Sequence, residues 1–274
     1  MVSFGYYEKS RITNLANLSQ KAIEYAKSAR KPMTSYINVK NLSKNFEAIN
    51  AVKDISLQVE QGEVLGFLGP NGAGKSTTMK MLTGFLEPDQ GSVFIKKLNL
   101  HDQPLKAKSL MGYLPEGAPA YSDMTVSSFL NFIGLMRGLK DSLLNDRLQE
   151  MSDQINLNNV WDQPIETLSK GYKRRVGIAQ ALIHDPEILV LDEPTDGLDP
   201  NQKFEMRNLI KSISKKKGII ISTHILEEVE AVCSRTIIIA NGKLLLNKKT
   251  NELLKAKNKK LDDVFREITS EKNK

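Results

Sequence analysis

The sequence predicts an α/β fold built around a buried parallel sheet, and three observations lead to this prediction. Short, continuous apolar runs recur along the chain, as expected for strands that are buried on both faces. Longer segments with helical spacing alternate with these runs. The length of 274 residues, with 40% hydrophobic and 26% charged residues, suits one large domain or two small ones of this class.

The strands are expected in two groups. Alternating segments predict half-exposed antiparallel strands at 37–39, 56–59 and 92–95. Continuous apolar runs predict parallel strands at 64–68, 188–191 and 219–222. A hairpin is expected near the end of the domain, because 236–240 and 243–246 flank Asn241-Gly242, a dipeptide that favours a type I′ turn.

Helices are expected between the strands and, above all, in the middle of the chain. Apolar residues at helical spacing predict helices at 76–83, 125–137, 141–155, 170–184 and 200–214. Asp199 and Pro200 are typical of a helix start, with the aspartate as N-cap and the proline in the first helical position.

Composition excludes several classes of protein. The longest apolar stretches, such as 219–221 and 237–240, are far shorter than the ~18 residues of a membrane-spanning helix. No apolar segment typical of a signal peptide stands near the N-terminus, and the single cysteine, Cys233, cannot form an intramolecular disulfide. We therefore expect a cytoplasmic protein.

The formal net charge of +7 is concentrated at the two ends. Residues 1–32 hold six basic and two acidic side chains, and residues 243–274 hold ten and five. Two interpretations stay open: solvated tails, or contact with an anionic membrane surface. Nucleic-acid binders more often carry a basic stripe across the folded body, so no nucleic-acid partner is expected.

The same segments suggest the domain organisation. We expect an N-terminal extension over 1–35, flexible or weakly helical, because the sequence from Met33 onward resembles a fresh domain start. The main domain is expected over 36–246. A basic C-terminal tail with a short helix is expected over 247–274.

The strongest chemical signal is a phosphate-binding loop after the strand predicted at 64–68. The motif G-x-x-x-x-G-K-[ST] is complete in Gly69, Pro70, Asn71, Gly72, Ala73, Gly74, Lys75, Ser76 and Thr77. Its glycines let backbone N–H groups turn toward phosphate oxygens, and the following helix adds its positive dipole end. Lys75 supplies a charge to the β- and γ-phosphates, and the Ser76 hydroxyl is a candidate Mg²⁺ ligand.

An acidic pair follows the apolar run 188–191. Asp192 and Glu193 lie where a buried strand ends, at the edge where α/β sheets bind ligands. Asp192 is placed to hold Mg²⁺ through its water shell, and Glu193 is placed to orient and deprotonate a water molecule. By itself such a pair could cap a turn, but beside a phosphate loop it predicts nucleotide hydrolysis.

Other classes with a phosphate loop explain the sequence less well. A GTPase needs Asn-Lys-x-Asp, and the nearest string, at 247–250, lacks the aspartate. A small-molecule kinase does not explain the segment 168–182, LSKGYKRRVGIAQAL, which precedes Asp192. This segment closely resembles the signature of the ATP-binding-cassette (ABC) transporter ATPases. The resemblance covers about residues 36–246, with the motifs in the right order.

The resemblance implies the architecture and the roles of individual residues. It implies a P-loop NTPase cassette with a RecA-like parallel-sheet core, an antiparallel β subdomain and a helical signature subdomain at about 113–170. It matches Phe46 to the aromatic residue that stacks on adenine, and His224 to the switch histidine at the γ-phosphate. We therefore expect Glu193 and His224 as the catalytic residues, whereas His101 and His184 are expected to be structural.

Two further segments are matched to contacts between subunits. The resemblance implies that the signature contacts ATP held by a second subunit, through Leu168, Ser169, Lys170, Gly171 and Tyr172. Ser169 is expected to cap the helix that begins there. The loop that crosses between the two sites is matched by Asp196, Gly197, Leu198 and Asp199.

The sequence departs from the family pattern at three positions. Lys170 and Tyr172 replace the usual glycine and glutamine of the signature, and Glu116 replaces the glutamine that samples Mg²⁺. A carboxylate offers Mg²⁺ an oxygen, but it adds charge and cannot donate a hydrogen bond. Together with LDDVF at 261–265, these departures resemble an export-type branch that includes drug, polysaccharide, lipid and gliding-associated exporters.

The predicted function is therefore an ATPase subunit that uses ATP and Mg²⁺, dimerises on ATP and drives a separate membrane permease. We expect a homodimer on the inner face of the cytoplasmic membrane, with the permease docked on exposed apolar residues such as Tyr121, Met124 and Phe129. Two alternatives stay open: a soluble ABC ATPase acting on nucleic acid or ribosomes, and a regulatory module without turnover.

Overall fold

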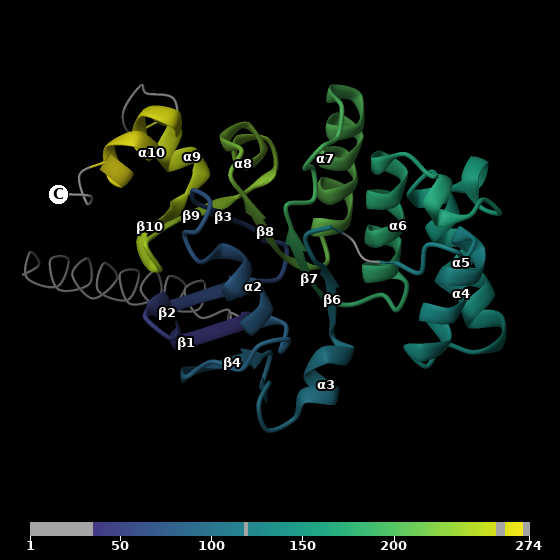
Figure 1. Ribbon diagram of the computed structural model, residues 1–274, viewed down its shortest axis with the longest axis horizontal. Coiled ribbons are helices and arrows are strands. Elements are labelled where there is room, and N and C mark those ends of the chain that lie inside the picture. Colours follow the sequence, from purple (N-terminus) through teal and green to yellow (C-terminus); the bar gives the residue numbers. More distant parts are fainter. Residues whose placement is uncertain (1–34, 118–119, 256–260, 271–274) are drawn as a thin grey trace, which may run out of the picture. The chain divides into compact units, whose positions relative to one another are not determined.

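The computed structural model describes residues 35–117, 120–255 and 261–270 (Figure 1). The predicted N-terminal extension lies outside these residues, except for Ser35, which begins the first strand. The division of the chain into extension, domain and tail stays a prediction.

A six-stranded sheet forms the centre of the domain, in the order β10-β9-β3-β8-β7-β6. Its strands are β3 (Val64–Leu68), β6 (Met111–Leu114), β7 (Ile188–Asp192), β8 (Gly218–Thr223), β9 (Arg235–Ala240) and β10 (Lys243–Lys249). All neighbouring pairs are parallel except β9 and β10. Every residue of β3, β7 and β8 is buried, which confirms that the continuous apolar runs form the core strands.

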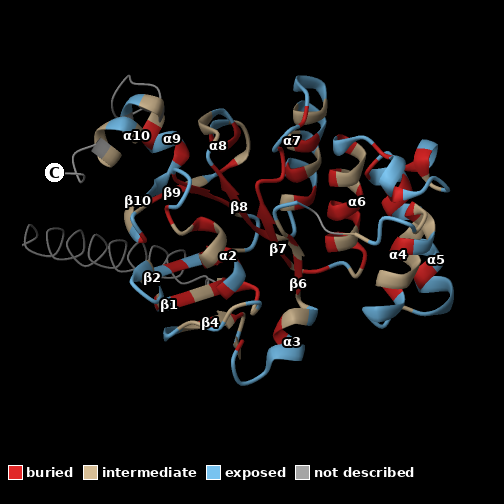
Figure 2. Cartoon of the chain, in the orientation of Figure 1, coloured by how far each residue is buried: buried red, intermediate tan, exposed pale blue. Residues whose placement is uncertain are grey.

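Two apolar clusters lie on the two faces of this sheet, and alternate residues of each central strand belong to different clusters. In β3, Val64 and Leu68 join one cluster with helices α6 (Lys170–Leu182) and α7 (Pro200–Ser214), whereas Leu65 and Phe67 join the other with helix α2 (Lys75–Leu82). The buried residues therefore concentrate on the central strands (Figure 2). Both faces are covered, as expected for a parallel sheet.

A second, antiparallel sheet packs over the face that α2 (Lys75–Leu82) covers. Its order is β2-β1-β4-β5, with β1 (Ser35–Phe46), β2 (Ile49–Glu60), β4 (Gln90–Ile95) and β5 (Leu98–Asn99). The predicted segments were of the right type but too short. The reason is that β1 and β2 shift register at several points, which breaks the strict alternation of apolar and polar residues.

The helical subdomain lies beyond β6 at one end of the sheet (Figure 1). It contains α4 (Val126–Met136), α5 (Asp141–Gln154) and α6 (Lys170–Leu182), with 3-10 turns at Asn158–Val160 and Ile165–Thr167. Thr125 caps α4, because its side chain accepts a hydrogen bond from the Ser128 N–H at 3.2 Å. The three predicted helices are therefore confirmed to within a few residues.

The remaining helices connect the strands or follow the sheet. They are α3 (Pro104–Ser109), α7 (Pro200–Ser214), α8 (Leu226–Val232), α9 (Thr250–Lys255) and α10 (Leu261–Ser270). Asp199 caps α7 as predicted, accepting from the Gln202 N–H at 3.0 Å. The predicted type I′ turn is also confirmed, because Asn241 and Gly242 both have positive φ, 51° and 75°.

Several features differ from the sequence prediction. The strand β6 and the helices α3 and α8 were not predicted, since each is too short to show a clear period. Phe129 is not an exposed docking residue: it is buried against the core of the helical subdomain, whereas Tyr121 is 57% exposed. Past the predicted domain end, Phe265 and Ile268 of α10 pack against the core.

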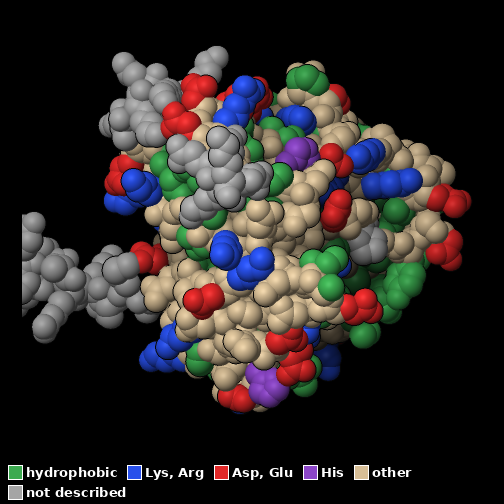
Figure 3. All heavy atoms as spheres, turned by 60° about the vertical axis from the view of Figure 1, so that its left-hand side comes forward, with side chains coloured by type: hydrophobic (Ala, Val, Ile, Leu, Met, Phe, Trp, Pro, Cys, Tyr) green, Lys and Arg blue, Asp and Glu red, His purple; other side chains and the backbone are tan. Residues whose placement is uncertain are grey.

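Two observations concern nucleic-acid binding and membrane-spanning helices. On the face drawn in Figure 3, acidic and basic side chains are mixed rather than gathered into a basic stripe. Within the described residues, no helix is both long and apolar enough to cross a membrane.

Candidate functional site

The predicted phosphate loop joins β3 to α2 at the carboxyl end of the parallel sheet. Gly72 and Gly74 have φ values of 77° and 102°, in the left-handed region that favours glycine. A Cβ on Gly74 would lie 2.4 Å from the carbonyl oxygen of Ala51, so no side chain fits there. Gly74 is also the N-cap of α2 and makes no side-chain cap hydrogen bond, which leaves the first N–H groups of the helix to a ligand.

Lys75 is the buried cation of the site, only 6% exposed. Its Nζ donates hydrogen bonds to the carbonyl oxygens of Gly69 at 2.8 Å and Pro70 at 3.2 Å, and lies 3.8 Å from Glu193 Oε1. Burial lowers the pKa of Lys75, and the carboxylates around it, Glu193 first, oppose this shift. The loop itself therefore holds the lysine in position.

Asp192 and Glu193 stand at the end of β7, as predicted. Asp192 is 1% exposed, and its Oδ1 accepts a hydrogen bond from the hydroxyl of Ser222 on the neighbouring strand β8. The Glu193 N–H donates to the carbonyl oxygen of Ser222 at 3.1 Å. Burial raises the pKa of Tyr113, as do the nearby carboxylates of Asp192 and Glu116, so the phenol stays protonated.

His224 follows β8 and meets Glu193 across the sheet edge. Its Nδ1 lies 3.0 Å from Glu193 Oε1, the same oxygen that faces Lys75 Nζ. The structure therefore brings together three predicted residues from three segments of the chain: the phosphate loop, the end of β7 and the end of β8. Parallel strands make this possible, because their carboxyl ends share one edge.

A cavity of about 970 Å³ opens at this edge. Its lining includes the predicted residues Asn71, Gly72, Gly74, Lys75, Ser76, Thr77, Glu116, Glu193, Asp196 and His224. The remaining wall comes from the start of β2 and from the β9–β10 turn, including Ala48, Ile49, Asn50, Ala51, Lys53, Asn241 and Gly242. A mixed polar cleft of this size fits a nucleoside triphosphate.

Phe46 and several loop residues do not line this cavity among the described residues. Phe46 ends β1 and is 45% exposed, with the Lys44 ammonium 5.8 Å from its ring centroid. Gly69, Pro70 and Ala73 form the base of the loop, where a Cβ on Gly69 would lie 2.5 Å from the Ile239 carbonyl oxygen.

The predicted signature does not line the cavity either, within the described part of the chain. Ser169 caps α6, because its hydroxyl accepts from the Tyr172 N–H at 3.3 Å. Lys170 Nζ forms an ion pair with Asp196 at 3.0 Å and its side chain lies over Gly197. Gly171 packs against Gln202.

The other signature and crossing-loop residues are anchored in different ways. Leu168 and Leu198 are buried in the core, and the Asp199 side chain is engaged in capping α7. The Tyr172 ring lies under the guanidinium of Arg175, 5.5 Å from centroid to Cζ. The segment therefore leaves Ser169 and Lys170 at the start of α6, outside the cavity of its own chain.

Two features of the site were not predicted from the sequence: Ser222 and the wall formed by the β1–β2 connection. Ser222 ends an apolar run, and nothing in its neighbourhood marks it as the partner of Asp192. The start of β2 lies against Gly74 and Gly242 only because the smaller sheet packs over the larger one, with Lys53 N donating to the Gly242 carbonyl oxygen at 2.8 Å.

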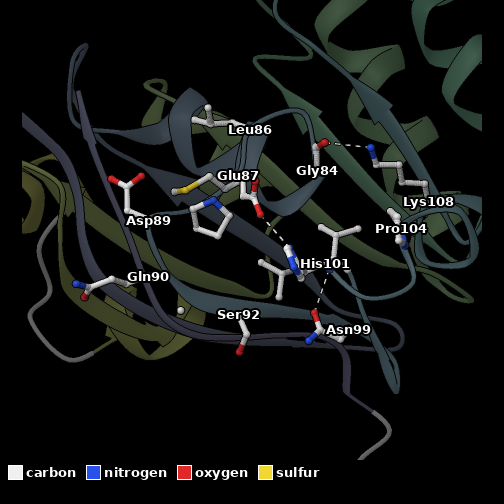
Figure 4. A pocket seen from close by; sticks show the side chains of 15 residues that line it. Gly84, Leu86, Glu87, Asp89, Gln90, Ser92, Asn99, His101, Pro104 and Lys108 are labelled. Atoms are coloured by element: carbon white, nitrogen blue, oxygen red, sulfur yellow. Dashed lines mark hydrogen bonds and ion pairs between the residues drawn. The ribbon is translucent and has the colours of Figure 1, made fainter. Parts of the chain in front are cut away.

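A second cavity of about 470 Å³ lies between the end of α2, β4 and α3 (Figure 4). His101 Nδ1 pairs with Glu87 Oε1 at 2.9 Å, and Lys108 Nζ donates to the Gly84 carbonyl oxygen at 3.0 Å. Asp89 is held by Lys44 at 2.7 Å. These charged groups are thus engaged by partners at the cavity wall, His101 and Asp89 in ion pairs and Lys108 by a main-chain carbonyl.

The oxygen donors of the main cavity suit Mg²⁺. Ser76 and Glu116 line it, and Asp192 lies directly behind Glu193 with one carboxylate oxygen engaged by Ser222. Among the described residues, no cluster of three His, Cys, Asp or Glu side chains forms a metal cage. Mg²⁺ keeps several waters and uses one or two protein oxygens plus substrate phosphates, so this donor set fits the ion.

Fold and site together define a P-loop protein that binds and hydrolyses a nucleoside triphosphate. A family model described as "ABC transporter" matches residues 52–196. The chain belongs to this family, as an ATP-binding subunit with ATPase activity.

Similar proteins support this assignment. The chain is 36% identical over 220 residues to the uncharacterized ABC transporter ATP-binding protein YxlF of Bacillus subtilis, covering 79% of this chain and 72% of that protein. It is 34% identical over 222 residues to Nod factor export ATP-binding protein I of Ralstonia nicotianae, covering 81% and 69%. A solved structure described as the ATP-binding subunit of an ABC transporter superposes with a TM-score of 0.79 at 30% identity, covering 86% of this chain and 100% of that one.

These comparisons confirm the predicted family, fold class and ATPase function. The alternative of an ABC ATPase that acts on nucleic acid or ribosomes finds no support, because the relatives are named as transporter subunits. The alternative of a regulatory module without turnover loses its basis with the ATPase assignment.

Proposed function

We propose that two copies of this chain bind two ATP molecules between them, each ATP held by the phosphate loop of one copy and the signature of the other. The observation that carries this proposal is the position of the signature. Ser169 and Lys170 lie at the exposed start of α6, outside the cavity that contains the phosphate loop of the same chain. A second copy supplies the missing helix N-terminus.

Within each site, Glu193 is the proposed general base. Its Oε1 faces Lys75 Nζ on one side and His224 Nδ1 on the other, at 3.8 and 3.0 Å. Lys75 binds the β- and γ-phosphates in this proposal, while His224 orients the carboxylate and contacts the γ-phosphate. Glu193 then accepts the proton of the water that attacks the γ-phosphate.

Mg²⁺ is the proposed cofactor, held by Ser76 and, through water, by Asp192. The ion would neutralise charge that develops on the phosphate oxygens. Ser222 holds Asp192 in its orientation by donating to Oδ1, which leaves the other carboxylate oxygen available. Glu116 lines the same cavity and adds a third oxygen donor.

The proposed partner is an integral membrane permease, which places the subunit on the inner face of the cytoplasmic membrane. The helical subdomain exposes large apolar side chains that suit such a partner, Tyr121, Leu135, Met136 and Leu143, and Phe85 in the turn after α2 is exposed as well. Export is the proposed direction, in keeping with the name of the Ralstonia relative, Nod factor export ATP-binding protein I.

Glu193→Gln tests the composite site, because it keeps the shape of the side chain and removes its basicity. We expect ATP hydrolysis to fall about 10²–10⁴-fold while ATP binding persists. With ATP and Mg²⁺ the variant should accumulate as a dimer in light scattering, alone or with its permease. Glu87→Gln, at the second cavity, serves as the matched control and should leave both properties unchanged.

Two results would count against the proposal. Wild-type turnover in Glu193→Gln would show that this residue is not the base. A variant that binds ATP and hydrolyses it slowly but never associates, even in the permease complex, would support Glu193 as the general base. It would contradict the proposal that two copies bind ATP between them.

A further inference from the structure

Arg174 is a buried cation in the signature helix α6, only 6% exposed. Its guanidinium donates to four main-chain carbonyl oxygens. These belong to Asp192 at 3.0 Å, Pro194 at 3.3 Å, Pro115 at 3.3 Å and Glu193. Three of the four acceptors are therefore consecutive residues of the segment that carries the proposed metal ligand and base.

Burying a guanidinium is energetically unfavourable compared with burying an apolar side chain of similar size. Transferring a charge out of water is unfavourable, so a buried guanidinium persists only where hydrogen bonds compensate for the lost hydration. Burial accordingly lowers the pKa of Arg174, while the carboxylates of Asp196, Asp192, Glu193 and Glu116 oppose that shift. Only arginine offers five hydrogen-bond donors in one rigid, planar group. Its hydrogen bonds to the carbonyl groups, rather than its volume, therefore explain its place in this site.

The backbone that Arg174 holds is strained. Glu193 has φ of 49°, in the left-handed region, where a non-glycine residue is strained and persists only if its surroundings fix it. The carbonyl groups of Asp192, Glu193 and Pro194 span the peptide units on both sides of this residue. The guanidinium therefore contacts the main chain on both sides of the residue whose carboxylate faces Lys75 and His224.

The same side chain links three functional segments. Pro115 directly precedes Glu116, which lines the nucleotide cavity. Arg174 lies on the helix that Ser169 begins, so a displacement of the signature displaces the guanidinium as well. The end of β7, the loop at Glu116 and the signature helix thus meet at one residue that does not itself line the cavity in the described structure.

We propose that Arg174 is a positioning residue for ATP hydrolysis. It holds Glu193 in the left-handed conformation and ties that conformation to the position of the signature helix. The proposal rests on the proposed role of Glu193 as the general base. Since Arg174 acts through the main chain and does not bind ATP, its removal lowers turnover without weakening nucleotide binding.

Arg174→Met and Arg174→Lys test this role, with kcat, KM and ATP affinity measured separately. The methionine keeps most of the volume without a charge. It should lower kcat about 10²-fold, as expected for a misplaced catalytic group, while KM and ATP affinity change less than about twofold. The lysine should recover part of kcat, because an ammonium group reaches some of the carbonyl oxygens. If the methionine variant fails to fold, the lysine variant carries the same test.

Arg147→Met is the matched structural control. Arg147 also buries its guanidinium against α6, donating to the carbonyl oxygens of Ile183 at 2.8 Å and Leu182 at 2.7 Å, but at the opposite end of the helix. This variant should lower the melting temperature and leave kcat unchanged. An equal fall of kcat in Arg147→Met would show that the effect comes from helix stability, and wild-type kcat in both Arg174 variants would also overturn the proposal.

The double variant Arg174→Met/Glu193→Gln separates the two proposals. If Arg174 acts through Glu193, the double variant hydrolyses ATP no more slowly than Glu193→Gln alone. Losses that multiply would show that Arg174 acts independently of Glu193, which refutes the positioning role. Wild-type turnover in Glu193→Gln would instead refute the base itself.

Discussion

The phosphate loop and the signature each lead into the N-terminus of a helix, but the two helices are capped differently. At α2 the N-cap is Gly74, which makes no side-chain cap hydrogen bond. At α6 the N-cap is Ser169, whose hydroxyl already accepts the Tyr172 N–H. One helix start is thus left open for phosphate, whereas the other has a fixed first turn with its hydroxyl displayed.

The two lysines show the same difference. Lys75 is buried and held by carbonyl groups of its own loop, beside Glu193. Lys170 has a side chain that is 65% exposed and pairs with Asp196, whose side chain is 51% exposed. Preorganised groups that need no rearrangement are the more effective in catalysis. The difference indicates that the phosphate-loop half of each site is preorganised within one chain, whereas the signature half is exposed and available to a second copy.

The largest effect should come from the preorganised half. Lys75→Ala removes the buried cation that faces the polyphosphate. We expect ATP affinity to fall about 10–100-fold, as for a lost hydrogen bond to a charged group, and turnover to be abolished. Equilibrium nucleotide binding and a phosphate-release assay measure the two effects.

Lys80→Ala is the control for that variant, because Lys80 lies exposed in the last turn of the same helix. It should bind and hydrolyse ATP normally. Unchanged affinity and hydrolysis in Lys75→Ala would contradict the assignment of the phosphate loop.

The sequence predicted those parts of the molecule in which local chemistry decides the structure. The buried runs that became β3, β7 and β8 are apolar on both faces, and the helix starts at Thr125, Ser169 and Asp199 carry capping side chains. The glycines before Lys75 allowed the phosphate-binding loop to be predicted. These signals lie within a few residues of the feature that they predict.

The parts that were missed depend on contacts between distant segments. β6 has only four residues, and it is a strand because it pairs with β7. Ser222 supports Asp192, and Arg174 holds the backbone of Glu193, only because the fold brings these segments together. The roles of the individual site residues stay predictions until the variants described above are measured.

A smaller effect is expected just past the far end of α6, where His184 connects the chain after the helix to strand β6. Its Nε2 binds the Met111 carbonyl oxygen at 3.0 Å, and burial lowers the pKa of His184 from 6.5 to about 4. Between these two pH values the unfolded chain binds a proton that the native chain does not. The free energy of unfolding should therefore decrease as the pH falls from 6.5 to 4, by at most about 3 kcal/mol.

His184→Gln should flatten this part of the pH profile in denaturant titrations, since it removes the titrating group. Activity at neutral pH should not change. This result would show that the C-terminal end of α6 contributes to stability, whereas its N-terminal end contributes to function. A His184→Gln profile parallel to that of the wild type would contradict the prediction.

The smallest effect on stability is expected at the start of α6, for the ion pair between Lys170 and Asp196. The two groups are 3.0 Å apart, with side chains 65% and 51% exposed, and surface pairs of this kind contribute about 0–1 kcal/mol. Lys170→Ala and Asp196→Asn should each change the free energy of unfolding by less than about 1 kcal/mol. A pair this weak is easily exchanged for a stronger anion, such as the phosphate of ATP on a second copy.

ATP-dependent association distinguishes such an exchange from a fixed pair. In the Glu193→Gln background, Lys170→Ala should weaken the dimer by at most about fivefold, because a phosphate contact is lost. Asp196→Asn should leave it as strong or strengthen it, since the lysine is then free to turn toward the phosphate. If both variants weaken the dimer equally and the double variant adds nothing, the pair acts by holding the crossing loop in place. Lys170 would then belong with the anchored residues of its chain, and the displayed half of the site would consist of Ser169 and the helix N-terminus alone.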